Sequence, residues 1–143
     1  MTLRALAIAT HIVGLILWVG GTASAALVAA SVADAAEETR KVAYGAARKA
    51  VLFIGTPGLV LTWIAGLAVL LPDFSVLYAR AGWMHGKLTV ILLLTALTGA
   101  LTGRLRRAAK GTAVSATTFG GLAIGLVLGA AIIVFLAILR PGA

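Results

Sequence analysis

Long stretches without a charged side chain constrain the fold of this chain more than any other feature. No Asp, Glu, Lys or Arg occurs in residues 5–33, 50–72 or 111–139. Each stretch is longer than the roughly 20 residues that an α-helix needs to cross a bilayer core. Only 11% of all residues are charged, whereas soluble domains carry roughly 25%. The sequence therefore predicts an all-α integral membrane protein.

A fourth uncharged stretch, residues 88–103, is too short to cross a bilayer alone. We therefore expect its helix to begin near Trp83, which places His85 and Lys87 in its first turns. The complete prediction is a single domain, residues 1–143, that folds as a four-transmembrane-helix bundle. The expected helices cover about residues 3–32, 51–71, 83–104 and 113–139.

Two local features refine these helices. The loop of residues 34–49 mixes charges of both signs with good helix formers, so we expect a helical extension beyond the membrane. Pro57 lies in the first third of the second helix and predicts a kink or a local opening there. The apolar run of the first stretch is too long for a cleaved signal peptide, so we expect it to persist as a helix.

The basic residues predict the orientation of the bundle. The formal net charge is +8, which in a membrane protein is a topology signal, and no nucleic-acid partner is expected. The first and third loops carry most of the cations, so the positive-inside rule places both loops in the cytoplasm and both termini outside. These loop cations are Arg40, Lys41, Arg48, Lys49, Arg104, Arg106, Arg107 and Lys110.

Small residues predict tight helix packing in the fourth helix. Gly121, Gly125 and Gly129 recur at intervals of four and form a small-residue seam. We favour packing within the bundle for this seam, and the alternative is a homo-oligomer through the same three glycines.

The two histidines are the strongest indication of function. His11 lies inside the first hydrophobic stretch, where an imidazole costs free energy unless it is hydrogen-bonded or binds a ligand. The predicted orientation places it in the outer half of the bilayer together with Trp63, His85 and Lys87. Trp18 is seven residues after His11, on nearly the same helix face.

Neutral imidazole binds both haem iron and copper, so His11 and His85 are the candidate metal ligands. The chain has no cysteine, which excludes disulfides and thiolate metal sites. All the acidic residues lie in loops, which argues against acid–base enzymes that act on water-soluble substrates.

These residues form a pattern that resembles the HemJ/CopD superfamily of small membrane proteins. The pattern is His11-x6-Trp18-x-Gly20-Gly21, then a helix with Gly66, then Trp83-Met84-His85-Gly86-Lys87 at the start of the third helix. The resemblance covers about two-thirds of the chain, and the chain length resembles that of HemJ. The Trp18-Val-Gly20-Gly21 form and the basic end of the third helix are closer to CopD.

The resemblance to HemJ implies a haem b-binding oxidoreductase of the bacterial inner membrane that oxidises protoporphyrinogen IX to protoporphyrin IX. It makes His11 and Lys87 the essential residues and Trp18 and Trp83 motif residues, while Trp63 and His85 are cofactor-binding candidates from their position. The resemblance to CopD implies instead a copper transport component with His11, Met84 and His85 as ligands. A third alternative is a cytochrome b-like subunit without catalysis of its own.

Overall fold

The computed structural model describes residues 2–140, apart from the side chains of residues 76 and 77. The described part is helical and contains no strand. In chain order its elements are α1 (Leu3–Ser31), α2 (Glu37–Ala50), η1 (Val51–Gly55), α3 (Thr56–Leu70), η2 (Leu71–Asp73), η3 (Phe74–Tyr78), α4 (Gly82–Ala108) and α5 (Ala116–Leu139).

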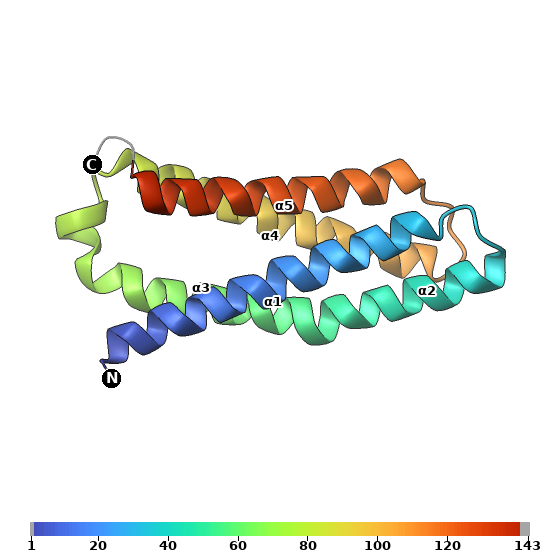
Figure 1. Ribbon diagram of the computed structural model, residues 1–143, viewed down its shortest axis with the longest axis horizontal. Coiled ribbons are helices and arrows are strands. Elements are labelled where there is room, and N and C mark those ends of the chain that lie inside the picture. The colour runs from blue at the N-terminus through green and yellow to red at the C-terminus, as the bar shows by residue number, and fades with distance from the viewer. Residues whose placement is uncertain (1, 141–143) are drawn as a thin grey trace.

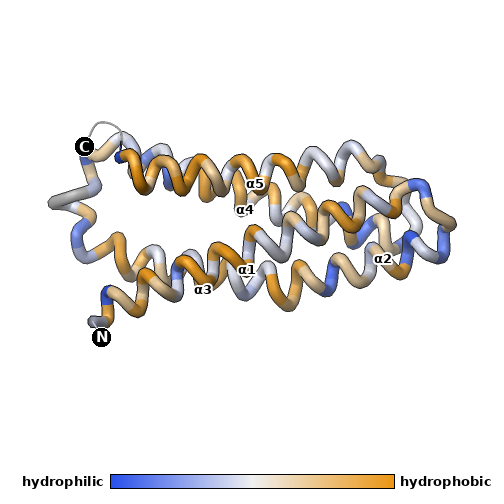
Figure 2. The backbone as a smooth tube through the Cα atoms, viewed as in Figure 1, coloured by the Kyte–Doolittle hydropathy of each residue, from blue (hydrophilic) through white to orange (hydrophobic). Residues whose placement is uncertain are grey.

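Four helical segments are long and apolar enough to cross a membrane. They are Leu3–Ser31, Glu37–Asp73, Gly82–Ala108 and Ala116–Leu139. Apolar residues follow most of each span, and hydrophilic residues gather toward the two ends of the bundle (Figure 2). The prediction of an all-α, four-helix membrane bundle is confirmed.

The second span is much longer than the predicted helix because α2 continues it beyond the apolar region. Glu37 and Glu38 lie in the first turn of α2, and Arg48 and Lys49 lie in the last turn. Both placements are favourable with the helix dipole. Glu37 also pairs with Lys41 one turn later, at 2.6 Å. The helical extension predicted for the first loop is confirmed.

Pro57 is preceded by a turn of π-helix, Val51–Gly55. Proline has no N–H to donate to the carbonyl four residues earlier, so the regular ladder is interrupted at this point. The Thr56 N–H bonds to the Val51 carbonyl five residues back, and the Thr56 hydroxyl donates to the same oxygen at 3.0 Å. The local opening predicted around Pro57 is therefore present, and the Val51 carbonyl within it accepts two hydrogen bonds from Thr56.

Glycines allow the backbones of α1 and α3 to approach closely. A Cβ atom at Gly58 would lie 2.5 Å from the Trp18 backbone nitrogen, and one at Gly14 would lie 2.7 Å from the Thr62 backbone nitrogen. Both distances are shorter than any real carbon–nitrogen contact, so only glycine fits at this crossing.

The glycine seam of α5 is used within the bundle in two of its three positions. Gly129 faces Leu94 of α4, and Gly125 faces Leu97 of α4. Gly121 has no heavy atom near its missing Cβ. Packing within the bundle is thus present at two positions, and a homo-oligomer through this seam stays a prediction.

The bundle is closed at one end and open at the other. Figure 1 shows α1 alongside α3 and α4 alongside α5, with the two pairs close together near α2 and apart near both termini. Tyr44 and Phe119 contact each other at the closed end, with ring centroids 5.5 Å apart. The fully buried Trp18, Leu101 and Leu126 continue this core toward the middle of the bundle.

Replacing Gly58 with alanine is expected to destabilise the fold by roughly 1–3 kcal/mol, because the new methyl group collides with the α1 backbone. The matched control is Gly103→Ala in α4, where nothing lies within contact distance; it is expected to be neutral or slightly stabilising. The free energy of unfolding of each purified variant in detergent, compared with wild type, measures both effects. Equal stability of the two variants would contradict the close crossing.

Candidate functional site

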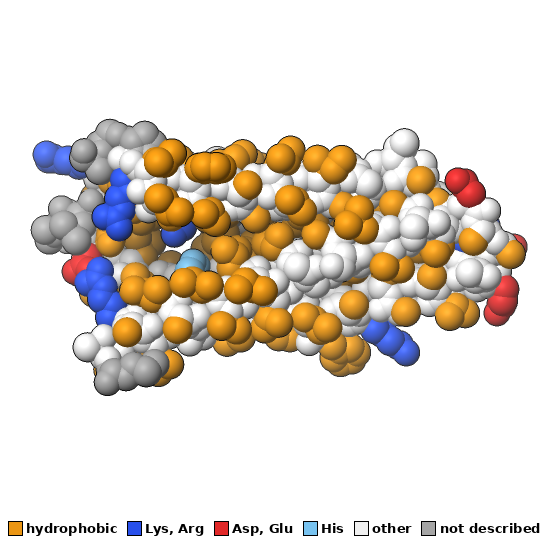
Figure 3. Space-filling model, in the orientation of Figure 1, with side chains coloured by type: hydrophobic (Ala, Val, Ile, Leu, Met, Phe, Trp, Pro, Cys, Tyr) orange, Lys and Arg blue, Asp and Glu red, His pale blue; other side chains and the backbone are white. Residues whose placement is uncertain are grey.

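A cavity of about 300 Å³ occupies the open half of the bundle. It lies between the α1–α3 pair and the α4–α5 pair, and Figure 3 shows a hollow at this position with a histidine side chain inside it. The wall is mostly apolar. The polar or aromatic side chains that line it are His11, Thr62, Trp63, Tyr78, Trp83, Lys87 and Arg140.

His11 is held by a backbone acceptor on the neighbouring helix. Its Nδ1 lies 2.8 Å from the carbonyl oxygen of Thr62. A carbonyl only accepts hydrogen bonds, so Nδ1 carries the proton and donates it. In the neutral ring Nε2 is then the atom with a free lone pair. This is the arrangement in which an imidazole binds a metal ion or accepts a proton.

Gly66 provides the space in which this ring lies. A Cβ atom at Gly66 would be 2.9 Å from both Cε1 and Nδ1 of His11. The α1–α3 crossing therefore supplies both the hydrogen bond that orients the imidazole and the clearance around it.

Two tryptophans connect the α1–α3 pair to α4. Trp18 Nε1 donates to the Thr98 hydroxyl at 2.8 Å, and Trp63 Nε1 donates to the Thr95 hydroxyl at 3.2 Å. Each threonine in turn donates to a carbonyl one turn back on α4. Trp63 lines the cavity, whereas Trp18 is fully buried outside its lining. Trp18 thus belongs to the core that supports the site.

Aromatic and cationic side chains surround the outer part of the cavity. The Arg140 guanidinium lies over the Trp83 ring, 5.6 Å from its centroid, and Tyr78 meets the same ring edge-on at 5.9 Å. Lys87 is half-buried in the cavity wall. Among the described residues no Asp or Glu lines this cavity. The site is therefore an apolar chamber with a cationic rim.

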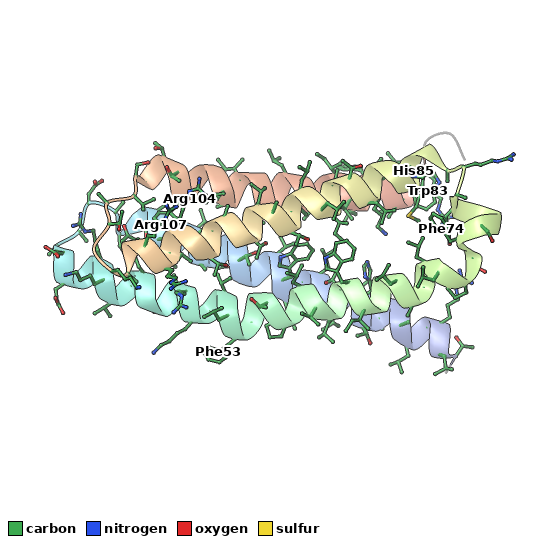
Figure 4. The ribbon with its side chains drawn as sticks, turned by 180° about the vertical axis from the view of Figure 1, so that it is seen from behind. Phe53, Phe74, Trp83, His85, Arg104 and Arg107 are labelled. Atoms are coloured by element: carbon green, nitrogen blue, oxygen red, sulfur yellow. The ribbon has the colours of Figure 1, made fainter. Side chains whose placement is uncertain are left out.

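His85 lies away from this chamber. It is exposed at the start of α4, with Nε2 3.0 Å from the Ala79 carbonyl oxygen, and it is absent from the cavity lining. Figure 4 shows His85 and Trp83 at this end of α4 and Arg104 and Arg107 at the other. The structure does not bring His11 and His85 together as a ligand pair. Within residues 2–140 no group of three or more His, Cys, Asp or Glu side chains is placed to hold a metal ion.

Of the site residues predicted from sequence, the cavity contains His11, Trp63, Trp83 and Lys87. Sequence reasoning missed Arg140 and Tyr78 as parts of the site. The predicted topology offered one indication for Arg140, because it ends the fourth span on the same side of the bilayer as Lys87.

Comparisons with protein-family models, curated proteins and solved structures found no match to this chain.

The orientation of His11 is testable because the chain contains only two histidines. Nitrogen-15 NMR of histidine-labelled protein is expected to show a neutral His11 ring protonated at Nδ1. Gly66→Ala is expected to shift the His11 signals, because its methyl group displaces the ring, and to leave those of His85 unchanged. The spectrum of His85→Ala lacks the His85 signals, so it identifies which signals belong to each histidine. A His11 ring protonated at Nε2 would contradict the bond to Thr62.

Proposed function

We propose that this protein is a membrane oxidoreductase that binds haem b and acts on a tetrapyrrole, as the resemblance to HemJ implies. One observation carries the proposal: His11 is oriented by the Thr62 carbonyl through Nδ1, and its side chain lines an apolar, aromatic cavity with a cationic rim. Haem b combines the properties that such a site accommodates, because it has a metal that imidazole binds, a flat apolar ring and two carboxylates.

The donor set fits haem with one protein ligand. His11 supplies a single imidazole, and Lys87 and Arg140 supply cations at the rim for the propionates. The cavity volume is at the lower end of the range for ligand pockets, and a porphyrin is larger. The cavity also has an open side, where Ile8 and Ile12 of α1 line it and remain about half exposed. A ligand larger than the chamber would therefore be only partly enclosed by these residues.

The residues of the chain have separate roles in this proposal. Haem b, when bound, supplies an iron centre that exchanges one electron at a time. His11 would bind the iron, and Trp63 and Trp83 would offer flat apolar contact. Lys87 would hold a carboxylate of the tetrapyrrole in its charged form, or take up a proton from the macrocycle in its neutral form. Trp18 supports the inner end of the site through Thr98.

The distribution of cations supports an orientation with the cavity in the outer half of a bacterial inner membrane. The loops at the closed end carry more Lys and Arg than the end that holds the cavity. By the positive-inside rule the closed end, with both of these loops, lies in the cytoplasm and both termini lie outside.

Copper binding is the second candidate, and Met84 is the observation that favours it. Met84 is buried and lines the same cavity as His11. A thioether and an imidazole together suit copper. His85, the third ligand that this alternative expects, lies outside the cavity, so haem is favoured. A cytochrome-like subunit without catalysis uses the same haem site.

Protein purified in detergent is expected to show a Soret band, and His11→Ala is expected to abolish most of it because the iron loses its protein ligand. The matched control is His85→Ala, which removes the exposed histidine and should retain the band. A colourless protein that binds copper stoichiometrically would overturn the haem proposal. Loss of the band in both variants would instead restore His85 as a ligand.

Expression of the protein is expected to rescue a bacterial strain that lacks protoporphyrinogen oxidase. Lys87→Gln should reduce the rescue at least tenfold, since it removes both the charge that would hold a substrate carboxylate and the amine that would take up a proton. Lys110→Gln, at the closed end of the bundle, is the control and should rescue fully. Failure of a well-expressed, haem-loaded protein to rescue would favour the electron carrier over the enzyme.

A further inference from the structure

We propose that Arg140 and Lys87 together form a carboxylate-binding site that selects apolar ligands with acidic groups along one edge. The inference deepens the proposed function and rests on it in one respect, namely that the cavity is the ligand site. It assigns Arg140, which the sequence pattern did not include, as a specificity-determining residue.

Arg140 is positioned by contacts from three directions. Its guanidinium lies over the Trp83 ring, its Nε donates to the Ala137 carbonyl at 3.4 Å, and its backbone N–H donates to the Leu136 carbonyl at 3.3 Å. The residue ends α5 in a left-handed conformation, with a φ of 42°. The cation–π contact with Trp83 holds the guanidinium beside the cavity. The outer nitrogens remain to bind a carboxylate side-on, which is the geometry that arginine favours.

Lys87 has no acidic side chain to neutralise it within the part of the chain that the structure describes. The whole sequence contains four acidic residues. Three of them lie at the opposite end, before or within the first turn of α2, and the fourth, Asp73, pairs with Arg4 at 3.0 Å. A cation that is half-buried in an apolar wall costs free energy unless an anion accompanies it. The ligand is the natural source of that anion.

The apolar part of the cavity indicates which kind of molecule carries the anionic group. The apolar part of the lining includes Leu67, Leu70, Leu88 and Ile91, together with the ring of Trp63. A small hydrophilic anion gains nothing from such a wall, whereas an apolar body does. The arrangement therefore favours an amphiphile whose carboxylates meet the two cations while its apolar part contacts the chamber wall.

The test compares metal-free protoporphyrin IX with its dimethyl ester. Both have the same ring, but only the diacid carries charge, and neither contains iron for His11 to bind. Binding is measured by quenching of tryptophan fluorescence, with the protein in phosphatidylcholine nanodiscs and empty nanodiscs as the partition blank. Because the lipid is the same in both arms, a difference between diacid and ester reports the porphyrin carboxylates and not a lipid phosphate.

The wild-type protein is expected to prefer the diacid by roughly tenfold or more, the scale of one charge-assisted hydrogen bond. Arg140→Gln and Lys87→Gln should each remove most of this preference, mainly because the diacid binds more weakly to these variants. Arg140→Lys retains the positive charge and should therefore keep part of the preference for the diacid. The matched control Arg80→Gln removes an exposed cation that does not line the cavity, and it should behave as wild type.

Equal binding of diacid and ester by the wild-type protein would overturn the inference, as would equal losses in Arg140→Gln and Arg80→Gln. Helix content by circular dichroism and a single peak in size-exclusion chromatography establish that each variant is folded. A protein that lacks a Soret band but prefers the diacid would refute haem binding and leave this inference standing.

Discussion

Gly14 and Gly58 let the backbones of α1 and α3 approach so closely that a side chain on either would collide with the other helix. This contact determines the geometry of everything on the outer side of it. It places His11 within hydrogen-bond distance of the Thr62 carbonyl and places Gly66 beneath the imidazole. Without the close crossing, His11 would be a polar group in lipid with no partner, which is costly in a membrane.

The two helix pairs separate toward the end that holds the cavity. Hydrogen bonds from two tryptophans limit this separation. Trp18 and Trp63 reach from α1 and α3 to hydroxyl groups of α4, so the pairs remain connected at the inner end of the cavity. Interhelical hydrogen bonds of this kind are worth only about 0.6 kcal/mol on average in membranes. Their contribution here is mainly positional, because each bond sets the distance between a helix pair and α4.

Electrostatics gives the cavity its chemical preference. An imidazole with an available Nε2 lies within the chamber, and Lys87 and Arg140 lie at its wall and rim. In a low-dielectric surrounding such charges attract anions strongly. The combination of imidazole, aromatic surface and cationic rim is what supports our proposal of a carboxylate-bearing tetrapyrrole as the ligand.

The sequence by itself determined the number of spans, the helical extension of α2, the opening before Pro57 and the position of His11 inside the first span. Each of these depends on the number of residues along a helix or on the backbone chemistry of a single residue such as proline. Both can be read directly from the sequence. The tertiary structure alone decided the partner of His11, the exclusion of His85 and the inclusion of Arg140. Those outcomes depend on how each helix is rotated about its axis. In a membrane helix the faces toward lipid and toward protein are both apolar, so the hydrophobic pattern does not reveal the rotation.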